Sequence, residues 1–421
     1  MESYEHRIVN GLLRELPEVA TPEVAQELLS RNVEICIGER GKDPDDLWPC
    51  VWALAVALSK QFTGTVFLNF ASADKMSSPA GFSDRVVLTE PHSSEVIRIG
   101  VGVGAGEGPF DLSGDTRGNR VSFSCLLDEG HGAANPIGCF ALAGYLGFAA
   151  LARAVGFPTF AEEYLGNMLE LPFDASAAME LPRDGIAFLG LGQLGQAYLA
   201  LLFFLTRKCH GQPRVFLLDK DRFEPANEPT QMLLEAGKPW LGLEKPEYLE
   251  MLVRRWGLQV TSQSRPLDWT FKRAEGVPSL ALLGFDNFEA RRIALNGGFD
   301  WIVEGGIGTS LTKPRVTWHS LVPSKELGRR LFAGSAEIRE FANKEFFETL
   351  KRTPGQCGWF SFRNVDASAP TMGLVAAAYV WAETKSVCDG GRHEVRGMAY
   401  IWPSVLPFRR EVLSRTRNVA A

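Results

Sequence analysis

Glycines at fixed spacing follow a short apolar run near the middle of the chain. The segment GIAFLGLGQLG places Gly190, Gly192 and Gly195 ahead of an apolar helix-like run. Such a turn lets the backbone approach a phosphate at a helix N-terminus, where exposed N–H groups and the helix dipole favour negative charge. A second apolar run ends in Asp219, which is placed to hydrogen-bond the hydroxyls of a ribose. We therefore expect a nucleotide at this turn.

Polar residues beyond Asp219 indicate the chemistry. Activating a carboxylate with ATP requires groups that hold the triphosphate, carry Mg²⁺, neutralise pyrophosphate and align the carboxylate with the α-phosphorus. We expect Asp286, after the apolar run SLALLG, to ligate Mg²⁺, and Lys245 to place its ammonium on the phosphates. The other candidates for nucleotide contacts are Asp221, Asn227, Gln231 and Asn287, with Arg291 and Asn296 bracing the loop. This order favours adenylation over hydride transfer.

Each of these residues also has an ordinary structural role open to it. An Asp-Asn pair after a strand is often only a helix N-cap. Lys245 taken alone is typical of a solvated lysine at a helix start. Arg291 and Arg292 are typical of a solvated helix face, with an internal salt bridge as the alternative for Arg291. The specificity lies in the combination, because strand, GxGxxG, DxD, Asn, Gln, Lys, strand and Asp-Asn occur in one order.

The seven cysteines include no CxxC pair, which disfavours a cysteine-rich zinc site and a disulfide framework. Cys357, between Gly355 and Gly358, is the candidate nucleophile because flanking glycines leave a thiol accessible; a buried structural cysteine is the alternative. Cys388 is the rival nucleophile. The remaining cysteines lie in apolar runs and are expected in the core: Cys36, Cys50, Cys125, Cys139 and Cys209. The histidines, His319 among them, are isolated and expected on loops or the surface.

Composition narrows the class of protein. A chain of 421 residues is long enough for two domains, and 45% hydrophobic with 22% charged residues is ordinary for a soluble α/β protein. The net charge of −6 argues against nucleic acid as the main partner. The charged N-terminus is unlike a secretory signal, and we expect no apolar run of the ~18 residues that a membrane span requires. A cytoplasmic location is the default expectation.

Two stretches of the chain share one order of elements. Residues 33–38 predict a buried strand, followed by an apolar helix and a second strand at 66–69, and residues 185–219 repeat that order. Residues 135–155 and 369–387 then each place Pro and Gly ahead of an Ala-rich apolar helix. We expect two similar α/β halves; a chance likeness between generic β-α-β units is the alternative.

The first half has lost the parts that hold a nucleotide. Its loop reads ERGKDPDD where the second has LGQLG, and carboxylates facing a triphosphate would repel it. Asn69 stands where the ribose-binding acid is expected. We therefore expect a degenerate domain at 1–178 and an active domain at 179–421, the latter interrupted by an inserted segment at about 311–366.

Residues 185–310 and 369–387 resemble the ubiquitin-activating enzyme superfamily, which includes the bacterial ThiF and MoeB proteins. LLDKDRFEPANEPTQ is similar to that superfamily's LVDxDxVxxSNLxRQ, GLEKP to its GxxKA, and LLGFDNFEARRIALN to its DCTDNxxxRxxLN. SAPTMGLVAAAYVWAETKS is similar to its closing P-xx-G-xx-AxxxxExxK helix. The resemblance implies two Rossmann-like, ThiF-type halves, the first inactive and the second carrying the nucleotide site.

The resemblance also implies a reaction. The superfamily uses ATP and Mg²⁺ to adenylate the C-terminal glycine of a ubiquitin-like protein, and many members then form a thioester with a cysteine, here Cys357. It implies as partners a ubiquitin-like protein and a conjugating-enzyme-like protein. The arginine of NLxRQ is replaced by Thr230, and the missing CxxC pairs remove zinc from the expected cofactors. Arg7, in a segment similar to the superfamily's YxRQ, is the candidate for the missing phosphate-binding charge.

Other functions remain open at this point. One is adenylation of a sulfur-carrier protein or a small carboxylate without a cysteine thioester. An NAD-dependent oxidoreductase is disfavoured, because Lys245 and Asp286-Asn287 would have no role in it. A non-catalytic adaptor that kept the fold is supported best by Thr230.

Overall fold

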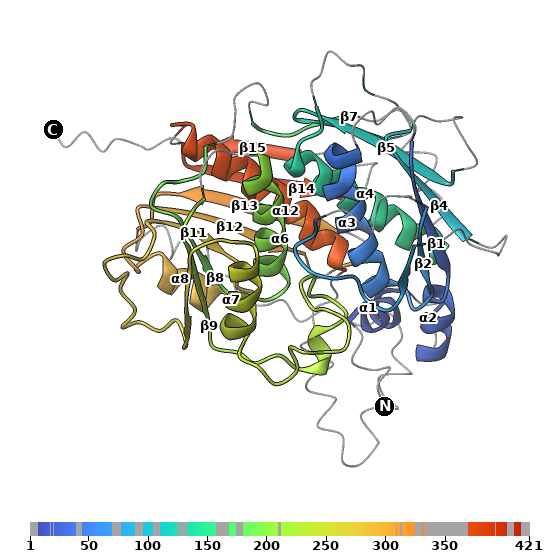
Figure 1. Cartoon of the computed structure of the whole chain (residues 1–421), viewed down its shortest axis with the longest axis horizontal. Helices are drawn as coiled ribbons and strands as arrows, with labels where there is room; N and C mark the ends of the chain where they lie inside the picture. Colours follow the sequence, from blue (N-terminus) through green and yellow to red (C-terminus); the bar gives the residue numbers. More distant parts are fainter. Residues whose placement is uncertain are drawn as a thin grey trace.

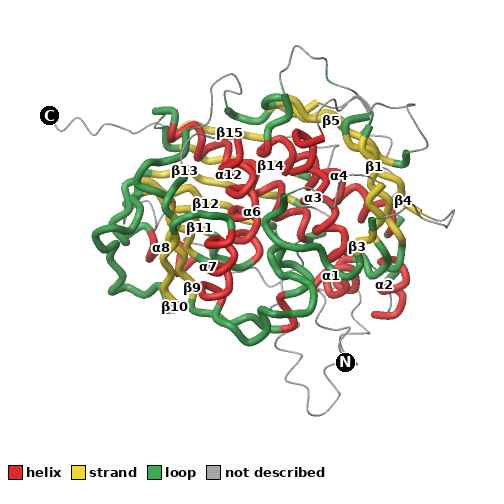
Figure 2. Tube along the Cα trace, in the orientation of Figure 1, coloured by secondary structure: helices red, strands yellow, loops and turns green. Residues whose placement is uncertain are grey.

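Two mixed β-sheets flank a central layer of helices in the computed structural model (Figures 1 and 2). The structure describes residues 7–16, 18–19, 21–38, 44–69, 77–88, 96–103, 110–123, 127, 133–156, 168–173, 180–208, 212–308, 310–311, 314–324, 331, 369–391, 393–401 and 408–413.

The first sheet has the order β3-β2-β1-β4-β5-β6-β7. The first five strands in this order run parallel to one another. Strand β6 pairs antiparallel with β5, and β7 pairs antiparallel with β6. The strands are β1 (Asn32–Ile37), β2 (Val66–Asn69), β3 (Val86–Val87), β4 (Val96–Val101), β5 (Leu112–Arg117), β6 (Arg120–Phe123) and β7 (Met168–Glu170). The helices of this half are α1 (Arg7–Glu15), α2 (Pro22–Leu29), α3 (Pro44–Gln61) and α4 (Pro136–Ala154).

The second sheet has the order β10-β9-β8-β11-β12-β13-β14-β15. Its first five strands run parallel and the last three are antiparallel. The strands are β8 (Ile186–Leu189), β9 (Val215–Asp219), β10 (Val260–Ser264), β11 (Leu280–Leu283), β12 (Trp301–Ile307), β13 (Arg315–Leu321), β14 (Val395–Tyr400) and β15 (Phe408–Val412). The helices are α6 (Gln193–Lys208), η4 (Pro225–Asn227, a 3₁₀ turn), α7 (Lys245–Arg255), α8 (Phe288–Ala294) and α12 (Pro370–Cys388).

The two sheets share one topology. Strand for strand, β3-β2-β1-β4-β5-β6-β7 corresponds to β10-β9-β8-β11-β12-β13-β14, with the same parallel and antiparallel senses. Helix α3 follows β1 as α6 follows β8, and the 19-residue helices α4 and α12 occupy matching places. The predicted internal repeat and the α/β class with two Rossmann-like halves are therefore confirmed.

The central helices bring the two halves together. Helix α4 packs on β5 and β6, α12 packs on β12 and β13, and the two helices contact each other. Glycine allows the close crossing, because a Cβ at Gly144 would lie 2.5 Å from Val375 Cγ2 and 2.8 Å from the carbonyl oxygen of Thr371. In the second half Trp318 stacks on Tyr379, with ring centroids 4.1 Å apart, and fixes α12 on its sheet.

Helix α4 contradicts the expectation that the chain has no apolar run long enough to span a membrane. Its 19 residues reach a mean hydropathy of 1.5, so by length and composition alone it is apolar enough to cross a membrane. Within the fold, however, 94% of its 18-residue window is buried. Its composition reflects contacts with a sheet on one side and with α3 and α12 on others.

Strand β13 corrects the expected bounds of the inserted segment. The sequence places an insertion at about 311–366, but residues 315–321 form a strand that pairs with β12 and β14 in the middle of the antiparallel part of the sheet. Its last four residues are all buried and include the polar His319 and Ser320, so the stretch lacks the regular polar and apolar alternation by which a strand is recognised in a sequence. Most of the remaining segment lies outside the described residues.

Candidate nucleotide-binding site

The glycine turn joins β8 to α6 at the carboxyl edge of the second sheet, next to β11. Gly190 has a φ of +84°, which favours glycine, and a Cβ at Gly195 would lie 2.1 Å from the carbonyl oxygen of Gly190. Gly284, at the end of β11, packs on both of them. Gly192 differs, because a Cβ there would meet nothing within 4 Å. Two glycines thus close the turn, and the third faces open space at the start of α6.

Asp219 ties this turn to the end of β9. Its Oδ2 accepts a hydrogen bond from Leu191 N at 2.6 Å, and its Oδ1 accepts from Lys220 N at 2.7 Å and from Asp221 N at 3.0 Å. The side chain is buried. In this structure the carboxylate therefore shapes the glycine turn, and its contact with a ribose stays a prediction.

A buried pair of amides connects the turn to the following loop. Gln196 Nε2 donates to Gln231 Oε1 at 2.5 Å and to the Leu191 carbonyl at 3.2 Å, while its Oε1 accepts from Leu233 N at 3.0 Å. Sequence reasoning found Gln231 but missed Gln196. The available signal was a polar residue in the first turn of a helix that is otherwise apolar.

Asn227 forms the tight turn that follows β9. Its Oδ1 accepts from Glu224 N at 3.0 Å, and its carbonyl accepts from Thr230 N and Gln231 N. Thr230, where the superfamily pattern has arginine, is buried beneath this turn. The loop EPANEPTQ is thus held by its own backbone and by Asn227.

Lys245 and Asp221 meet at the carboxyl end of β9. Lys245 Nζ lies 3.3 Å from Asp221 Oδ2, and Lys245 N donates to the Asp221 carbonyl at 2.9 Å. The lysine side chain is buried and the aspartate side chain is half exposed, so the structure rules out the alternative of a solvated lysine, and a contact of Lys245 with phosphate stays a prediction. The pair places a cation near the ribose-binding candidate Asp219.

Asp286 and Asn287 follow β11 at the same edge. Asn287 Oδ1 accepts from Ala290 N at 2.7 Å and caps α8, so its ordinary structural role is realised. Asp286 is exposed and accepts one bond from Asn287 Nδ2 at 3.4 Å. Among the described residues no three of His, Cys, Asp and Glu gather as a metal site, so a metal ion at Asp286 would draw its other ligands from phosphate oxygens and water.

A buried cluster of charged side chains, Arg291, Glu304 and His319, supports the backbone of the loop that contains Asp286. Arg291 donates from Nε and Nη2 to the Phe285 carbonyl, and its Nη1 lies 2.8 Å from Glu304 Oε2. Glu304 Oε1 also bonds His319 Nδ1 across the antiparallel pair β12–β13. Burial raises the pKa of Glu304, but Arg291 and His319 outweigh it and leave that pKa below its ordinary value of 4.5.

This cluster decides between the alternatives for Arg291, which forms an internal salt bridge and braces the Asp286 loop and does not lie on a solvated face. It overturns the expectation for His319, which is almost wholly buried and is not on the surface. Glu304 and His319 were missed because their relation depends on strand register, which no local pattern reveals. Asn296, also expected to brace the loop, donates to the Arg292 carbonyl at 2.8 Å and closes the end of α8.

The structure places Arg7 and several of the cysteines less completely. Cys357 lies outside the described residues, as do Cys125 and Cys209, and Arg7 opens α1 with its side chain not described. Cys50 and Cys139 are buried as expected, and burial raises the pKa of the Cys139 thiol to about 12. Cys36 is half-buried in β1.

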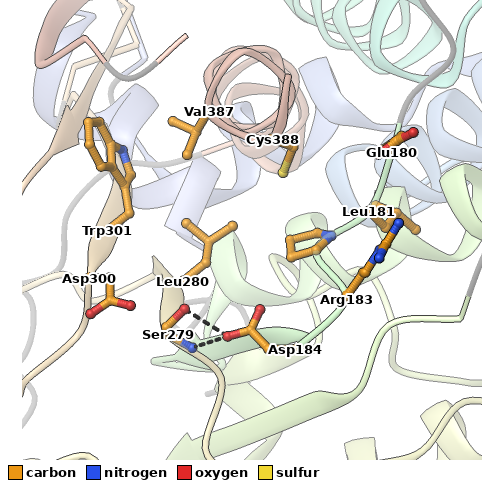
Figure 3. Close-up of a pocket in the computed structure, with 11 residues that line it drawn as sticks. Glu180, Leu181, Arg183, Asp184, Ser279, Leu280, Asp300, Trp301, Val387 and Cys388 are labelled. Atoms are coloured by element: carbon orange, nitrogen blue, oxygen red, sulfur yellow. Dashed lines mark hydrogen bonds between the residues drawn. The ribbon is translucent and has the colours of Figure 1, made fainter. Parts of the chain in front are cut away.

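Cys388 lies far from the glycine turn. It lines a pocket of about 360 Å³ with residues that precede β8, β11 and β12, at the amino edge of the sheet. Figure 3 shows Cys388 and Val387 at the end of α12 pointing into this pocket, above the Asp184–Ser279 hydrogen bonds. The other end of α12 is at the glycine turn, where Gln193 Nε2 donates to the Ala369 carbonyl at 2.8 Å. A helix of 19 residues separates the two ends by about 28 Å.

Comparisons with known proteins match the part of the chain that contains these residues. A family described as the BilD C-terminal domain matches residues 181–391, which include the glycine turn, the Lys245 and Asp286 loops and α12. The chain belongs to this family. The bacterial E1-like protein BilD of Collimonas sp. (strain OK412) is 27% identical over 207 residues. The family and this relative support the resemblance to E1-like proteins.

Coverage of these relatives is partial. The match to the Collimonas protein spans 48% of this chain and 44% of the relative, so less than half of that protein is represented. Among solved structures, Escherichia coli MccB with ATP is 16% identical, with a TM-score of 0.36 over 56% of this chain and 65% of that chain. MccB in complex with N-formylated MccA is 15% identical, with a TM-score of 0.38 over 56% and 66%.

Proposed function

We propose that this chain activates the C-terminal carboxylate of a ubiquitin-like protein with ATP and then carries the acyl group on Cys357. The observation that carries the proposal is the open space at Gly192, at the N-terminus of the 16-residue helix α6, in a chain of an E1-like family. Phosphates at this position would meet backbone N–H groups and the positive end of the helix dipole.

The surrounding side chains fit a nucleoside triphosphate. Asp219 is fixed at the end of β9, where its remaining lone pairs would accept ribose hydroxyls. Lys245 would exchange part of its contact with Asp221 for a phosphate oxygen. Mg²⁺, when bound, would neutralise charge on the phosphates, and Asp286 would be its ligand from the protein.

The first reaction needs a carboxylate aligned with the α-phosphorus. The carboxylate oxygen would form a bond to this phosphorus as the bond to the bridging oxygen of pyrophosphate breaks, giving an acyl-adenylate and pyrophosphate. The cationic side chain of Lys245 and the N-terminus of α6 would stabilise the charge on the leaving pyrophosphate.

The second reaction transfers the acyl group to sulfur. The thiolate of Cys357 would attack the acyl carbon, the carbon–sulfur bond would form, and AMP would leave with its bonding electron pair. Cys357 lies twelve residues before Ala369, and that number of residues spans at most about 40 Å. The anchor of this segment beside Gln193 therefore supports Cys357 over Cys388, which α12 holds about 28 Å from the turn.

Partner and setting follow from the same proposal. The activated protein would be a ubiquitin-like protein that ends in glycine, and a conjugating-enzyme-like protein would accept it from Cys357, in the cytoplasm. An enzyme that stops at the adenylate, acting on a sulfur-carrier protein or a small carboxylate, is the second candidate, since Thr230 takes the place of a phosphate-binding arginine.

ATP binding by a matched pair of glycine variants tests the site. Gly192→Ala adds a methyl group where the free protein has space, so we expect normal stability but ATP binding at least about tenfold weaker, as the methyl keeps phosphate oxygens from the backbone. Gly81→Ala is the control, because a Cβ there also meets nothing within 4 Å. Equal ATP affinities for both variants and the unmodified chain would refute the site. ATP–pyrophosphate exchange then separates adenylation from mere binding.

A further inference from the structure

A buried lysine of the first half reaches the nucleotide-site loop of the second. Lys60, near the end of α3, is 5% exposed, and its Nζ donates to the carbonyl oxygen of Glu228 at 3.0 Å. The two residues are 168 positions apart in the chain. This contact is made through the backbone of Glu228, so it constrains the course of the loop.

Hydrogen bonds connect the loop that Lys60 contacts to the glycine turn. Glu228 directly follows Asn227, whose carbonyl accepts from Thr230 N and Gln231 N. Gln231 in turn bonds Gln196, which bonds the carbonyl of Leu191 inside the glycine turn. A displacement at Glu228 is therefore transmitted to the backbone that faces the proposed phosphate position.

The loop also lacks positive charge of its own. EPANEPTQ contains two glutamates and no basic residue, and an uncompensated pair of carboxylates would repel a triphosphate. The Glu228 carboxylate pairs with Lys238 at the surface, 2.9 Å away. Lys60 brings a second cation to the loop from its buried side.

The charge of Lys60 is sensitive to pH in an accessible range. Burial lowers its pKa from the ordinary value of 10.5 to about 8, the Glu228 carboxylate acts in the opposite direction, and the Arg85 guanidinium lowers the pKa further. Arg85 donates to the carbonyls of Ser59 and Phe62 and so lies at the end of α3 beside Lys60. The ammonium form dominates below about pH 8 and is lost above it.

The repeat of the fold supplies a matching lysine. Helix α6 corresponds to α3, and Lys208 at its end reaches into the first half, where Nζ pairs with Asp46 and donates to the Ala134 carbonyl at 3.3 Å. Each half thus extends a lysine to the other. The two lysines differ in what they contact, because Asp46 lies in the first turn of α3, in the half without the glycine turn.

We propose that Lys60 is a positioning residue through which the first half completes the nucleotide site, by holding the 227–231 loop and adding a positive charge beneath it. The inference rests on the proposed binding of ATP in the second half. It gives the degenerate half a defined role in catalysis.

ATP affinity as a function of pH tests the inference. Calorimetric titration of the whole chain with ATP, between about pH 7 and 9.5, should show affinity falling as pH rises through about 8. Lys60→Met should bind ATP about tenfold more weakly at pH 7, the cost of one charge-assisted hydrogen bond, and should lose this pH dependence. Lys60→Arg should keep most of the affinity without the change near pH 8. Lys208→Met should retain the profile of the unmodified chain.

Hydrogen exchange in the protein without nucleotide distinguishes failure of this inference from failure of the proposed function. Amides of residues 227–231 should exchange faster in Lys60→Met than in the unmodified chain or in Lys208→Met. If the unmodified chain binds no ATP, the proposed function fails and the exchange result alone decides whether Lys60 positions the loop. Unchanged exchange in Lys60→Met, an unchanged ATP profile, or an equal loss in Lys208→Met would overturn the inference.

Discussion

Gln193, in the first turn of α6, donates a hydrogen bond from Nε2 to the carbonyl of Ala369, the N-cap residue of α12, at 2.8 Å. The two residues are 176 positions apart. The bond fixes the point at which the long segment containing Cys357 rejoins the described fold, and that point is the glycine turn.

Cysteine substitution should therefore separate the two proposed reactions. Cys357→Ala should leave ATP–pyrophosphate exchange largely intact and eliminate any thiol-reducible adduct with the partner protein, because the thiol acts after the adenylate has formed. Cys388→Ala should leave both the exchange and the adduct intact, since α12 holds Cys388 at the opposite edge of the sheet. An adduct that survives in Cys357→Ala and disappears in Cys388→Ala would reverse this assignment, and no adduct with a verified partner would mean that the enzyme stops at the adenylate.

Asp286→Ala should lower ATP–pyrophosphate exchange by about 100-fold or more, because the proposed metal ion loses its ligand from the protein. Asp286 is exposed, so the thermal midpoint should change little. Asp300→Ala removes an exposed carboxylate at the amino edge of the same sheet and should leave exchange unchanged. Normal exchange in Asp286→Ala would reject Asp286 as the metal ligand.

Nucleotide stoichiometry tests the degenerate first half. Calorimetry should give one ATP per chain, because only the second half carries the GxGxxG turn. Arg7→Ala should weaken ATP binding if the first half supplies phosphate-binding charge from its N-terminus, and combining it with Lys60→Met should weaken binding further. Two nucleotides per chain would contradict the assignment of the halves.

The ionisation of Glu304 should make the free energy of unfolding depend on pH in the acid range. Its pKa is lowered in the folded protein, so its stabilising effect is present above its ordinary pKa of 4.5 and is lost as pH falls through the lower folded value. Glu304→Gln removes the buried carboxylate that pairs with Arg291 and should cost about 3–5 kcal/mol of unfolding free energy at pH 7, measured by chemical denaturation. The loss should shrink below about pH 4.5.

Glu244→Gln is the matched control for this prediction. It removes the carboxylate of the more exposed Arg222–Glu244 ion pair and should change stability by less than about 1 kcal/mol. A comparable loss in both variants, or a loss in Glu304→Gln that does not depend on pH, would show that the buried cluster is not held by the charge of Glu304.

The sequence by itself determined the parts of this protein whose signals are local. Glycine spacing identified the turn between β8 and α6, because backbone crowding at Gly190 and Gly195 depends on near neighbours in the chain. Apolar periodicity and its repetition predicted two similar halves, since each β-α-β unit is encoded within a short stretch. The order of Asp219, Lys245 and Asp286 predicted one sheet edge, because parallel strands connected through helices end on the same side.

Only the tertiary structure decided how those residues are engaged. Asp219 is bound to backbone amides of two segments, Arg291 is buried against Glu304 and His319, and Lys60 crosses from one half to the other. Apart from the bonds that Asp219 accepts from its neighbours Lys220 and Asp221, these contacts join residues that are far apart in the chain or on different strands, so no periodic pattern encodes them. They arise from strand register and from the packing of α3, α4, α6 and α12 between two sheets, which the folded chain fixes as a whole.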